Sequence, residues 1–366
     1  MNFEFSEEQQ FIRDQARNFL AQECSAELVR GMLDSDAPYH EGLWRQIVDL
    51  GWTAMAVPEE FGGLGLGYLE LCVIAEELGR VVAPVPFSSS VYLATEAIKS
   101  FGSQAQKDAY LPKLAAGELI GTLAASEGLG ALAVSTLVRD GALHGEKVPV
   151  PDGDCADFAI VLASNEAGGN GLYIVDLHQP SVNRSTIKTV DPSRSQARLV
   201  AEGAAADPLV VGEGTDAALS ELMDRAAVLF AFEQIGGGQA AMDMGMAYTK
   251  ERYAFGRPVA SFQAIKHKFA DMFTALELAR ANAYYGAWAI SSDALDLPLA
   301  AATARVSATD AFWLISKENI QAHGGMGFTW EFDCHLYYRR AQLLASVIGT
   351  QPQWKEALAG RLLAAA

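Results

Sequence analysis

One acidic residue lies inside a strongly apolar run, where an ionisable group is able to do chemistry. Glu233 lies next to Phe232 and shortly before three consecutive glycines, 236–238. An unpaired buried carboxylate is costly, so an acid in such surroundings is either paired with a cation or retained for function. Glu233 is therefore a candidate general base whose pKa is tuned by burial. The alternative, which is the commoner one, is a structural carboxylate satisfied by an arginine or by the backbone.

Glu233 belongs to the first of several long predicted helices in the C-terminal part of the chain. Helical patterns extend over residues 216–252, 261–291 and 298–323, and a last helical segment begins at Cys334. Short loops join these segments, which favours antiparallel neighbours. We therefore predict a C-terminal four-helix bundle over residues 214–366.

Residues 1–118 are predicted to form an N-terminal helical domain. Ser6 and Gln9 form a capping box at the start of its first helix. Apolar residues then recur on one face of that helix: Ile12, Ala16, Phe19 and Leu20. The third predicted helix, 68–78, is expected to end at Gly79, because glycine favours a left-handed C-terminal cap.

Between residues 119 and 213 the pattern changes to short apolar runs, such as 158–162 and 172–175, separated by Asp, Gly and Pro. This texture is typical of a small β domain. The sequence thus predicts an α+β multidomain protein, with a helical domain, a central β domain and a helical bundle in chain order.

Composition excludes several classes of function. The chain has 366 residues and a formal net charge of −18, with half of its residues hydrophobic. This charge disfavours nucleic acid or an anionic membrane surface as a partner. The four cysteines, Cys24, Cys72, Cys155 and Cys334, have no spacing suited to a metal or to a disulfide framework. No signal segment or membrane span is recognisable, so we expect a cytoplasmic protein.

Several motifs follow one another along nearly the whole chain. They are Pro58 to Gly63, Gly102-Ser103-Gln104 with Tyr110-Leu111-Pro112, Glu251 to Arg257, Ser261-Phe262-Gln263, and Gln321 with Gly324-Gly325. In this order and spacing the chain resembles the acyl-CoA dehydrogenase family. The resemblance implies a helical domain, a central β-barrel domain and a four-helix bundle. It also implies FAD-dependent oxidation of an acyl-CoA thioester to a trans-2-enoyl-CoA, with an electron-transfer flavoprotein as acceptor.

The resemblance also implies a cofactor site. Similar proteins place the equivalents of Arg252, Phe255 and Gln263 across a subunit interface, against the adenosine and pyrophosphate half of FAD. A guanidinium suits pyrophosphate because it donates charge-assisted hydrogen bonds. Gln321, Gly324 and Gly325 complete the expected set, since glycine lets backbone approach a ligand closely. Taken singly, Arg252 would be only a helix-terminal cation and the glycines only a loop.

The catalytic base of the family is missing. Its commonest carrier lies 27 residues beyond the position of Gln321, which is Ile348 in this chain. Other members carry the base at the position of Ala226, and neither isoleucine nor alanine can accept a proton. Glu233 remains as a candidate because it follows Ala226 by two helical turns on roughly the same face.

The β domain departs from the family pattern as well. The expected flavin loop reads Ser126-Glu127-Gly128-Leu129-Gly130-Ala131. The tryptophan and threonine of the following strand are replaced by Pro149 and Pro151, which also lack backbone donors. The half of the site around the flavin ring is thus predicted to be eroded, whereas the adenosine half is retained.

Three hypotheses follow. The first is a subunit of a heteromeric dehydrogenase, expected to be a tetramer, similar to the smaller, base-lacking chain of the two-subunit enzymes of steroid side-chain breakdown. Its substrate would be a CoA thioester with a bulky or branched acyl group, and His323 would serve packing. The second is a homo-oligomer that uses Glu233 as base. The third is a non-catalytic structural or binding paralogue.

Overall fold

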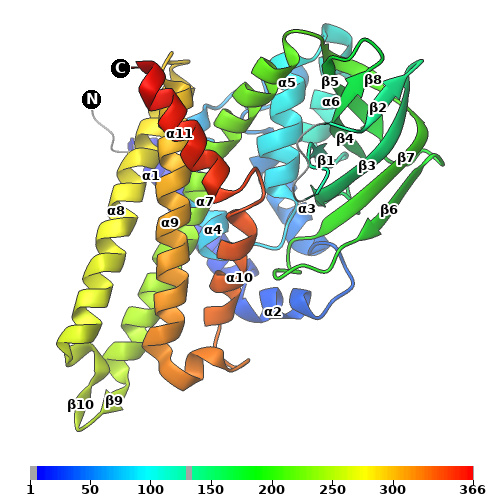
Figure 1. Ribbon diagram of the computed structural model, residues 1–366. Helices are drawn as coiled ribbons and strands as arrows, with labels where there is room; N and C mark the ends of the chain where they lie inside the picture. Colours follow the sequence, from blue (N-terminus) through cyan, green and yellow to red (C-terminus); the bar gives the residue numbers. More distant parts are fainter. Residues whose placement is uncertain (1–5, 129–133, 366) are drawn as a thin grey trace. The chain divides into compact units, whose positions relative to one another are not determined.

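The computed structural model describes residues 6–128 and 134–365. Helices come first in the chain, a sheet occupies the middle, and long helices return after it (Figure 1). The predicted order of a helical region, a central β domain and a helical C-terminal region is therefore confirmed. Part of the predicted flavin loop, residues 129–131, lies outside the described residues.

The N-terminal region consists of short helices. Their bounds are α1 Glu7–Glu23, α2 Ala26–Leu33, α3 Glu41–Asp49, α4 Tyr68–Arg80, α5 Glu96–Phe101 and α6 Gln104–Ala115, with 3-10 turns η1 Trp52–Ala54 and η2 Glu59–Phe61 and a π-helix η3 Ser88–Thr95. The predicted capping box of α1 is present, with Ser6 and Gln9 bonding reciprocally. On the predicted apolar face Ala16 and Leu20 are buried, whereas Ile12 and Phe19 are half-buried.

The predicted left-handed cap at Gly79 is wrong. α4 continues through Gly79 to Arg80. A Cβ at Gly79 would lie 1.9 Å from the backbone oxygen of Glu233, and one at Gly236 would lie 1.8 Å from that of Glu76. The glycines therefore permit a close approach of α4 to the helix α7, Thr215–Glu251. This also explains one of the three consecutive glycines inside α7.

The central sheet has the order β6-β7-β3-β2-β4-β5-β8, and β1 pairs with β4. Its strands are β1 Gly121–Ala124, β2 Leu137–Arg139, β3 Ala142–Pro151, β4 Phe158–Asn165, β5 Asn170–Asp176, β6 Val182–Thr186, β7 Gln196–Ala205 and β8 Asp207–Val211. β4 pairs in parallel with β1 and β2, and the remaining pairs are antiparallel. β4 is buried along most of its length, as expected for an inner strand with apolar neighbours on both faces.

The C-terminal helices after α7 are α8 Gln263–Ser291, α9 Leu297–His323, α10 Cys334–Leu344 and α11 Gln351–Ala365, with 3-10 turns η4 Val259–Ser261 and η5 Gly324–Phe328. The short hairpin β9 Tyr253–Ala254 and β10 Arg257–Pro258 connects α7 to α8. The last predicted segment is interrupted between residues 344 and 351, and Ile348 lies in this turn.

The described chain forms two compact units that do not follow sequence order. Unit 1 combines residues 1–31, 68–83 and 227–366, so α1 and α4 belong to the same unit as the long helices. Unit 2 combines residues 32–67 and 84–226 and contains the eight-stranded sheet. Among the described helices, none combines the length and the apolar character that crossing a bilayer requires.

Candidate functional site

The predicted cofactor residues after α7 lie at an exposed end of unit 1. Arg252 directly follows α7 and is held by its backbone: its N–H donates to Tyr248 O at 2.8 Å, and its carbonyl accepts from Val259 N at 2.8 Å. Phe255 lies in the hairpin turn with φ +53° and is 97% exposed. Gln263 begins α8 and is exposed. The exposed ring of Phe255 is open to contact with another molecule.

Gln321, Gly324 and Gly325 lie where α9 ends. Gly324 has φ +60° and its N–H bonds Gln321 O, so the left-handed conformation of glycine terminates the helix. All three residues are exposed, and a Cβ on either glycine would meet nothing within 4 Å. The hairpin and this turn lie at the same end of the helices of unit 1 (Figure 1). The structure thus brings both groups of predicted residues to one end.

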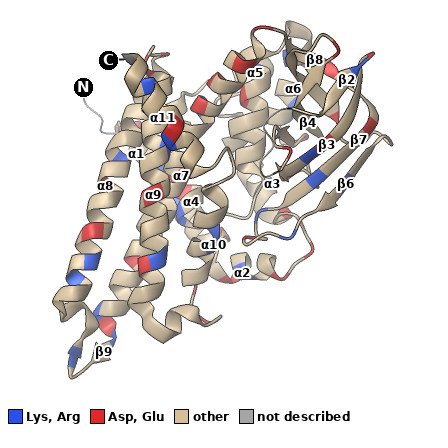
Figure 2. Cartoon of the chain, viewed as in Figure 1, with Lys and Arg blue, Asp and Glu red and all other residues tan. Residues whose placement is uncertain are grey.

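The chemistry of this end, which we call the bundle tip, differs from that of the chain as a whole. We define it by residues 250–263 and 321–330. Basic residues concentrate in the hairpin and in the adjoining part of α8 (Figure 2). Lys250, Arg252, Arg257 and Lys266 are exposed, and the Arg257 guanidinium lies 4.0 Å from the centroid of the Phe262 ring. Cationic donors beside exposed aromatic rings suit the phosphates and flat rings of a dinucleotide.

The two family positions for the base hold apolar side chains that are buried. Ile348 is 5% exposed, and its carbonyl accepts a hydrogen bond from Trp354 Nε1 at 3.0 Å. Ala226, on α7, is fully buried. Neither residue can take up a proton.

Glu233 is buried and lies in an ion pair with a buried arginine. Glu233 Oε1 is 3.7 Å from Arg340 Nη1, and both side chains are almost fully buried. The guanidinium of Arg340 also donates to the carbonyls of Val82, at 3.0 Å, and Ala83, at 3.3 Å. Glu233 therefore balances a cation that fastens α10 to the segment after α4.

A second buried arginine lies near the same carboxylate. Arg305, on α9, is fully buried and donates to Gln234 Oε1 at 3.0 Å and to Leu344 O. Burial lowers the pKa of Arg305 to about 9, and the charge of Glu233 opposes this shift. Because Glu233 is paired with one buried guanidinium and its charge favours the protonated form of a second, the geometry favours the structural role. The sequence hypothesis had missed Arg305 and Arg340; an arginine within the alanine-rich run 300–308 was the available signal.

His323 has no free imidazole face. It is buried and stacks on Tyr248 with ring centroids 4.1 Å apart, and its Nδ1 lies 2.8 Å from Asn319 O. Burial lowers the pKa of His323, so the ring is neutral near pH 7. These contacts are those of a packing residue.

In unit 2, a buried ion pair that sequence reasoning missed anchors the predicted flavin loop. Lys147 Nζ lies 2.6 Å from Glu127 Oε1, and Glu127 also accepts from Ser135 and Thr136. Burial alone would raise the pKa of Glu127, but these hydrogen bonds outweigh it and lower the pKa. Downstream, the pairing of β3 with β7 is interrupted between Lys147 and Val150, where Pro149 offers no N–H donor.

Comparison with known proteins gives the family. The acyl-CoA dehydrogenase N-terminal domain matches residues 6–118, and the acyl-CoA dehydrogenase C-terminal domain matches residues 212–363. Acyl-CoA dehydrogenase IpdE2 of Mycobacterium tuberculosis is 31% identical over 345 residues, which cover 93% of either chain.

Two solved structures have nearly the same fold over the whole chain. A variant of the Tcur3481–Tcur3483 steroid ACAD aligns with a TM-score of 0.89 at 28% identity, over 98% of this chain and 99% of the other. The ChsE4–ChsE5 complex from Mycobacterium tuberculosis aligns with a TM-score of 0.91 at 26% identity, over the full length of both. The chain therefore belongs to the acyl-CoA dehydrogenase family, whose members are FAD-dependent oxidoreductases.

Proposed function

We propose that this chain is the base-lacking subunit of a heteromeric FAD-dependent acyl-CoA dehydrogenase. In this assembly it contributes its bundle tip to the nucleotide half of FAD, and a related chain contributes the flavin-ring pocket and the carboxylate base. The observation that carries the proposal is the contrast between an exposed set of cofactor groups and buried apolar residues at both base positions.

The residues of the bundle tip fit the nucleotide half of FAD. Arg252 would donate to the pyrophosphate, the Gln263 amide would hydrogen-bond, and Phe255 would lie against a flat ring. The backbone at Gly324 and Gly325 is open to approach from outside the chain. When bound, FAD would supply the acceptor for the hydride that leaves the β carbon of the substrate.

Removal of the α proton requires a carboxylate, and neither family position for the base carries one in this chain. Ile348 and Ala226 are apolar, and Glu233 is paired with Arg340. Protonation of Glu233 would leave the buried Arg340 guanidinium without its carboxylate partner, so Glu233 is poorly suited to accept a proton in each turnover. A second chain is the source of the base that the reaction needs.

Relatives support the heteromer and the class of substrate. One solved relative is described as a ChsE4–ChsE5 complex. The other is described as a Tcur3481–Tcur3483 steroid ACAD. We infer a CoA thioester with a bulky, steroid-like acyl group as substrate. An electron-transfer flavoprotein is retained as the proposed acceptor.

Co-expression with an acyl-CoA dehydrogenase chain encoded by a neighbouring gene tests the proposal. The two chains should co-purify with bound flavin and oxidise steroid-acyl CoA thioesters, whereas this chain alone should lack turnover. A colourless, inactive mixture of well-folded chains would refute it, as would full activity of this chain alone.

A further inference from the structure

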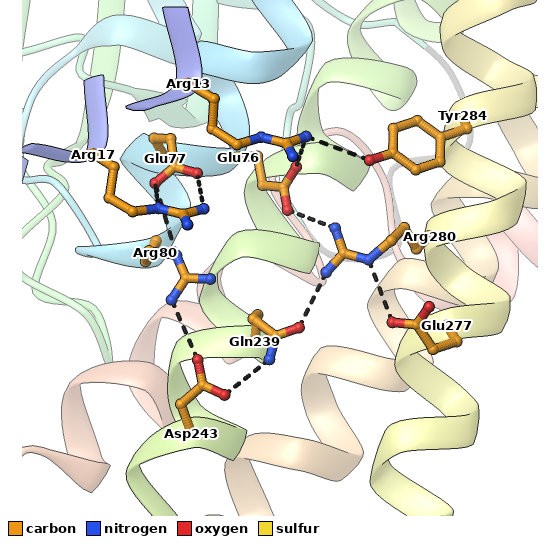
Figure 3. Close-up of polar contacts among 10 residues, drawn as sticks. All are labelled: Arg13, Arg17, Glu76, Glu77, Arg80, Gln239, Asp243, Glu277, Arg280 and Tyr284. Carbon is orange, nitrogen blue, oxygen red and sulfur yellow. Dashed lines mark hydrogen bonds and ion pairs between the residues drawn. The ribbon is translucent and has the colours of Figure 1, made fainter. Parts of the chain in front are cut away.

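A polar network connects α1 to α4, α7 and α8 (Figure 3). Arg17 donates to both carboxylate oxygens of Glu77, at 3.0 and 2.6 Å. Arg13 Nη2 lies 3.6 Å from Glu76 Oε2 and 3.4 Å from the Tyr284 hydroxyl. Both glutamates are neighbours on α4 and are buried, with 3% and 1% exposure. The α1 side of each pair is more open, since the Arg17 side chain is 43% exposed.

Each glutamate also has a second arginine that does not belong to α1. Arg280, on α8, lies 2.6 Å from Glu76, and Arg80, on α4 itself, lies 3.7 Å from Glu77. These arginines are held in turn by α7, because Arg280 donates to Gln239 and Arg80 pairs with Asp243 (Figure 3). Both carboxylates therefore keep a cation even without α1.

The apolar contact of α1 is small for a helix of 17 residues. Ala16 and Leu20 are its buried apolar side chains, and Phe11 on the same helix is 64% exposed. A further polar contact joins Gln9 to Glu70 at 2.9 Å. Polar pairs thus provide much of the docking of α1, and pairs with an exposed partner are weakened by salt.

We propose that α1 is a strap that detaches from unit 1 as one segment, while Glu76 and Glu77 remain paired with Arg280 and Arg80. Stranding a buried carboxylate normally opposes such an opening. The second arginine on each glutamate removes this penalty for the release of α1. Release uncovers the face of α4 that carries both carboxylates.

Amide hydrogen exchange of the full chain, followed by mass spectrometry, tests the strap. Peptides from α1 should exchange at least tenfold faster than those of α4 and α9, and faster still when salt rises from about 0.05 to 1 M. Equal protection of α1 and α4 at every salt concentration would overturn the proposal.

Two variants are expected to change the difference in amide exchange rate between α1 and α4 in opposite directions. Arg13→Gln with Arg17→Gln should accelerate exchange in α1 by about tenfold or more and leave α4 unchanged. Arg280→Gln leaves Arg13 as the arginine that reaches Glu76 among the described residues. Release of α1 would then leave Glu76 without a cation, so the difference in exchange rate between α1 and α4 should narrow. A network that serves only static stability predicts that Arg280→Gln widens this gap or leaves it unchanged. Should Arg280→Gln fail to fold, the salt series on the natural chain still decides.

Discussion

The bundle tip and the interior around Glu233 belong to the same unit but differ in almost every physical property. At the tip, Arg252, Phe255 and Gln263 are exposed. Around Glu233, each charged group is buried and paired within the chain. The comparison teaches that groups able to act on another molecule lie at the surface of this chain, whereas the buried acid Glu233 is paired inside it.

The largest expected effect concerns the interior. Glu233→Gln removes the carboxylate from the buried ion pair with Arg340 and should lower the free energy of unfolding by about 3–5 kcal/mol. Chemical denaturation of the purified chain measures this loss. Turnover per folded heteromer should stay within about twofold. A stable variant without turnover would instead identify Glu233 as the base and break the comparison.

The next effect concerns the tip. Arg252→Ala should leave stability unchanged because the residue is exposed, but it should weaken flavin retention in the assembled heteromer about tenfold or more. This corresponds to the loss of a hydrogen bond to a charged group, about 1.5–3 kcal/mol. Flavin absorbance after dialysis measures it. Arg139→Ala, an exposed arginine paired with Glu166 on the sheet, is the matched control and should have no effect.

The close approach of α4 to α7, the helix of Glu233, gives a third prediction. Gly236→Ala would place a Cβ against the backbone oxygen of Glu76, so α4 and α7 must separate, at a cost of about 1–3 kcal/mol. Thermal unfolding reports it. Gly360→Ala, on exposed α11, meets no atom within 4 Å and should be neutral or stabilising by up to about 1 kcal/mol. Equal effects at both positions would contradict the close approach.

The smallest effect is a pH dependence of the loop anchor in unit 2. The pKa of Glu127 is lowered in the folded state, so its hydrogen bonds stabilise the fold fully above the unfolded pKa near 4.3 and lose this effect as pH falls further. The stability difference between the natural chain and Glu127→Gln should shrink by about 1 kcal/mol from pH 6 to about pH 3.5. Urea titrations at the two pH values check it; a constant difference would argue against the lowered pKa.

Much of the fold was predictable because helical periodicity, capping and β texture are local properties. The Ser6–Gln9 capping box and the return of long helices near residue 215 illustrate this. Gly79 was misassigned because its role depends on Glu233, a residue distant in sequence. The boundaries at residues 118 and 213 remain predictions, as the compact units combine separate segments.

The candidate site also has features that could be predicted from the sequence and features that could not. The apolar residue at 348 was visible in the sequence, and so were the spaced residues of the tip. The pairing of Glu233 with Arg340, and its proximity to Arg305, was not visible, since these residues lie on three helices far apart in sequence. The Lys147–Glu127 pair was not predicted either, because the two residues are 20 positions apart in sequence and only the folded chain brings them together.

The ratio of flavin to protein chains, measured by absorbance on this chain alone and on the co-purified heteromer, tests the central claim most directly. The account predicts little or no flavin on the isolated chain and one flavin for every two chains in the heteromer. One flavin per chain in a homo-oligomer that is reduced by acyl-CoA without a second protein would contradict it.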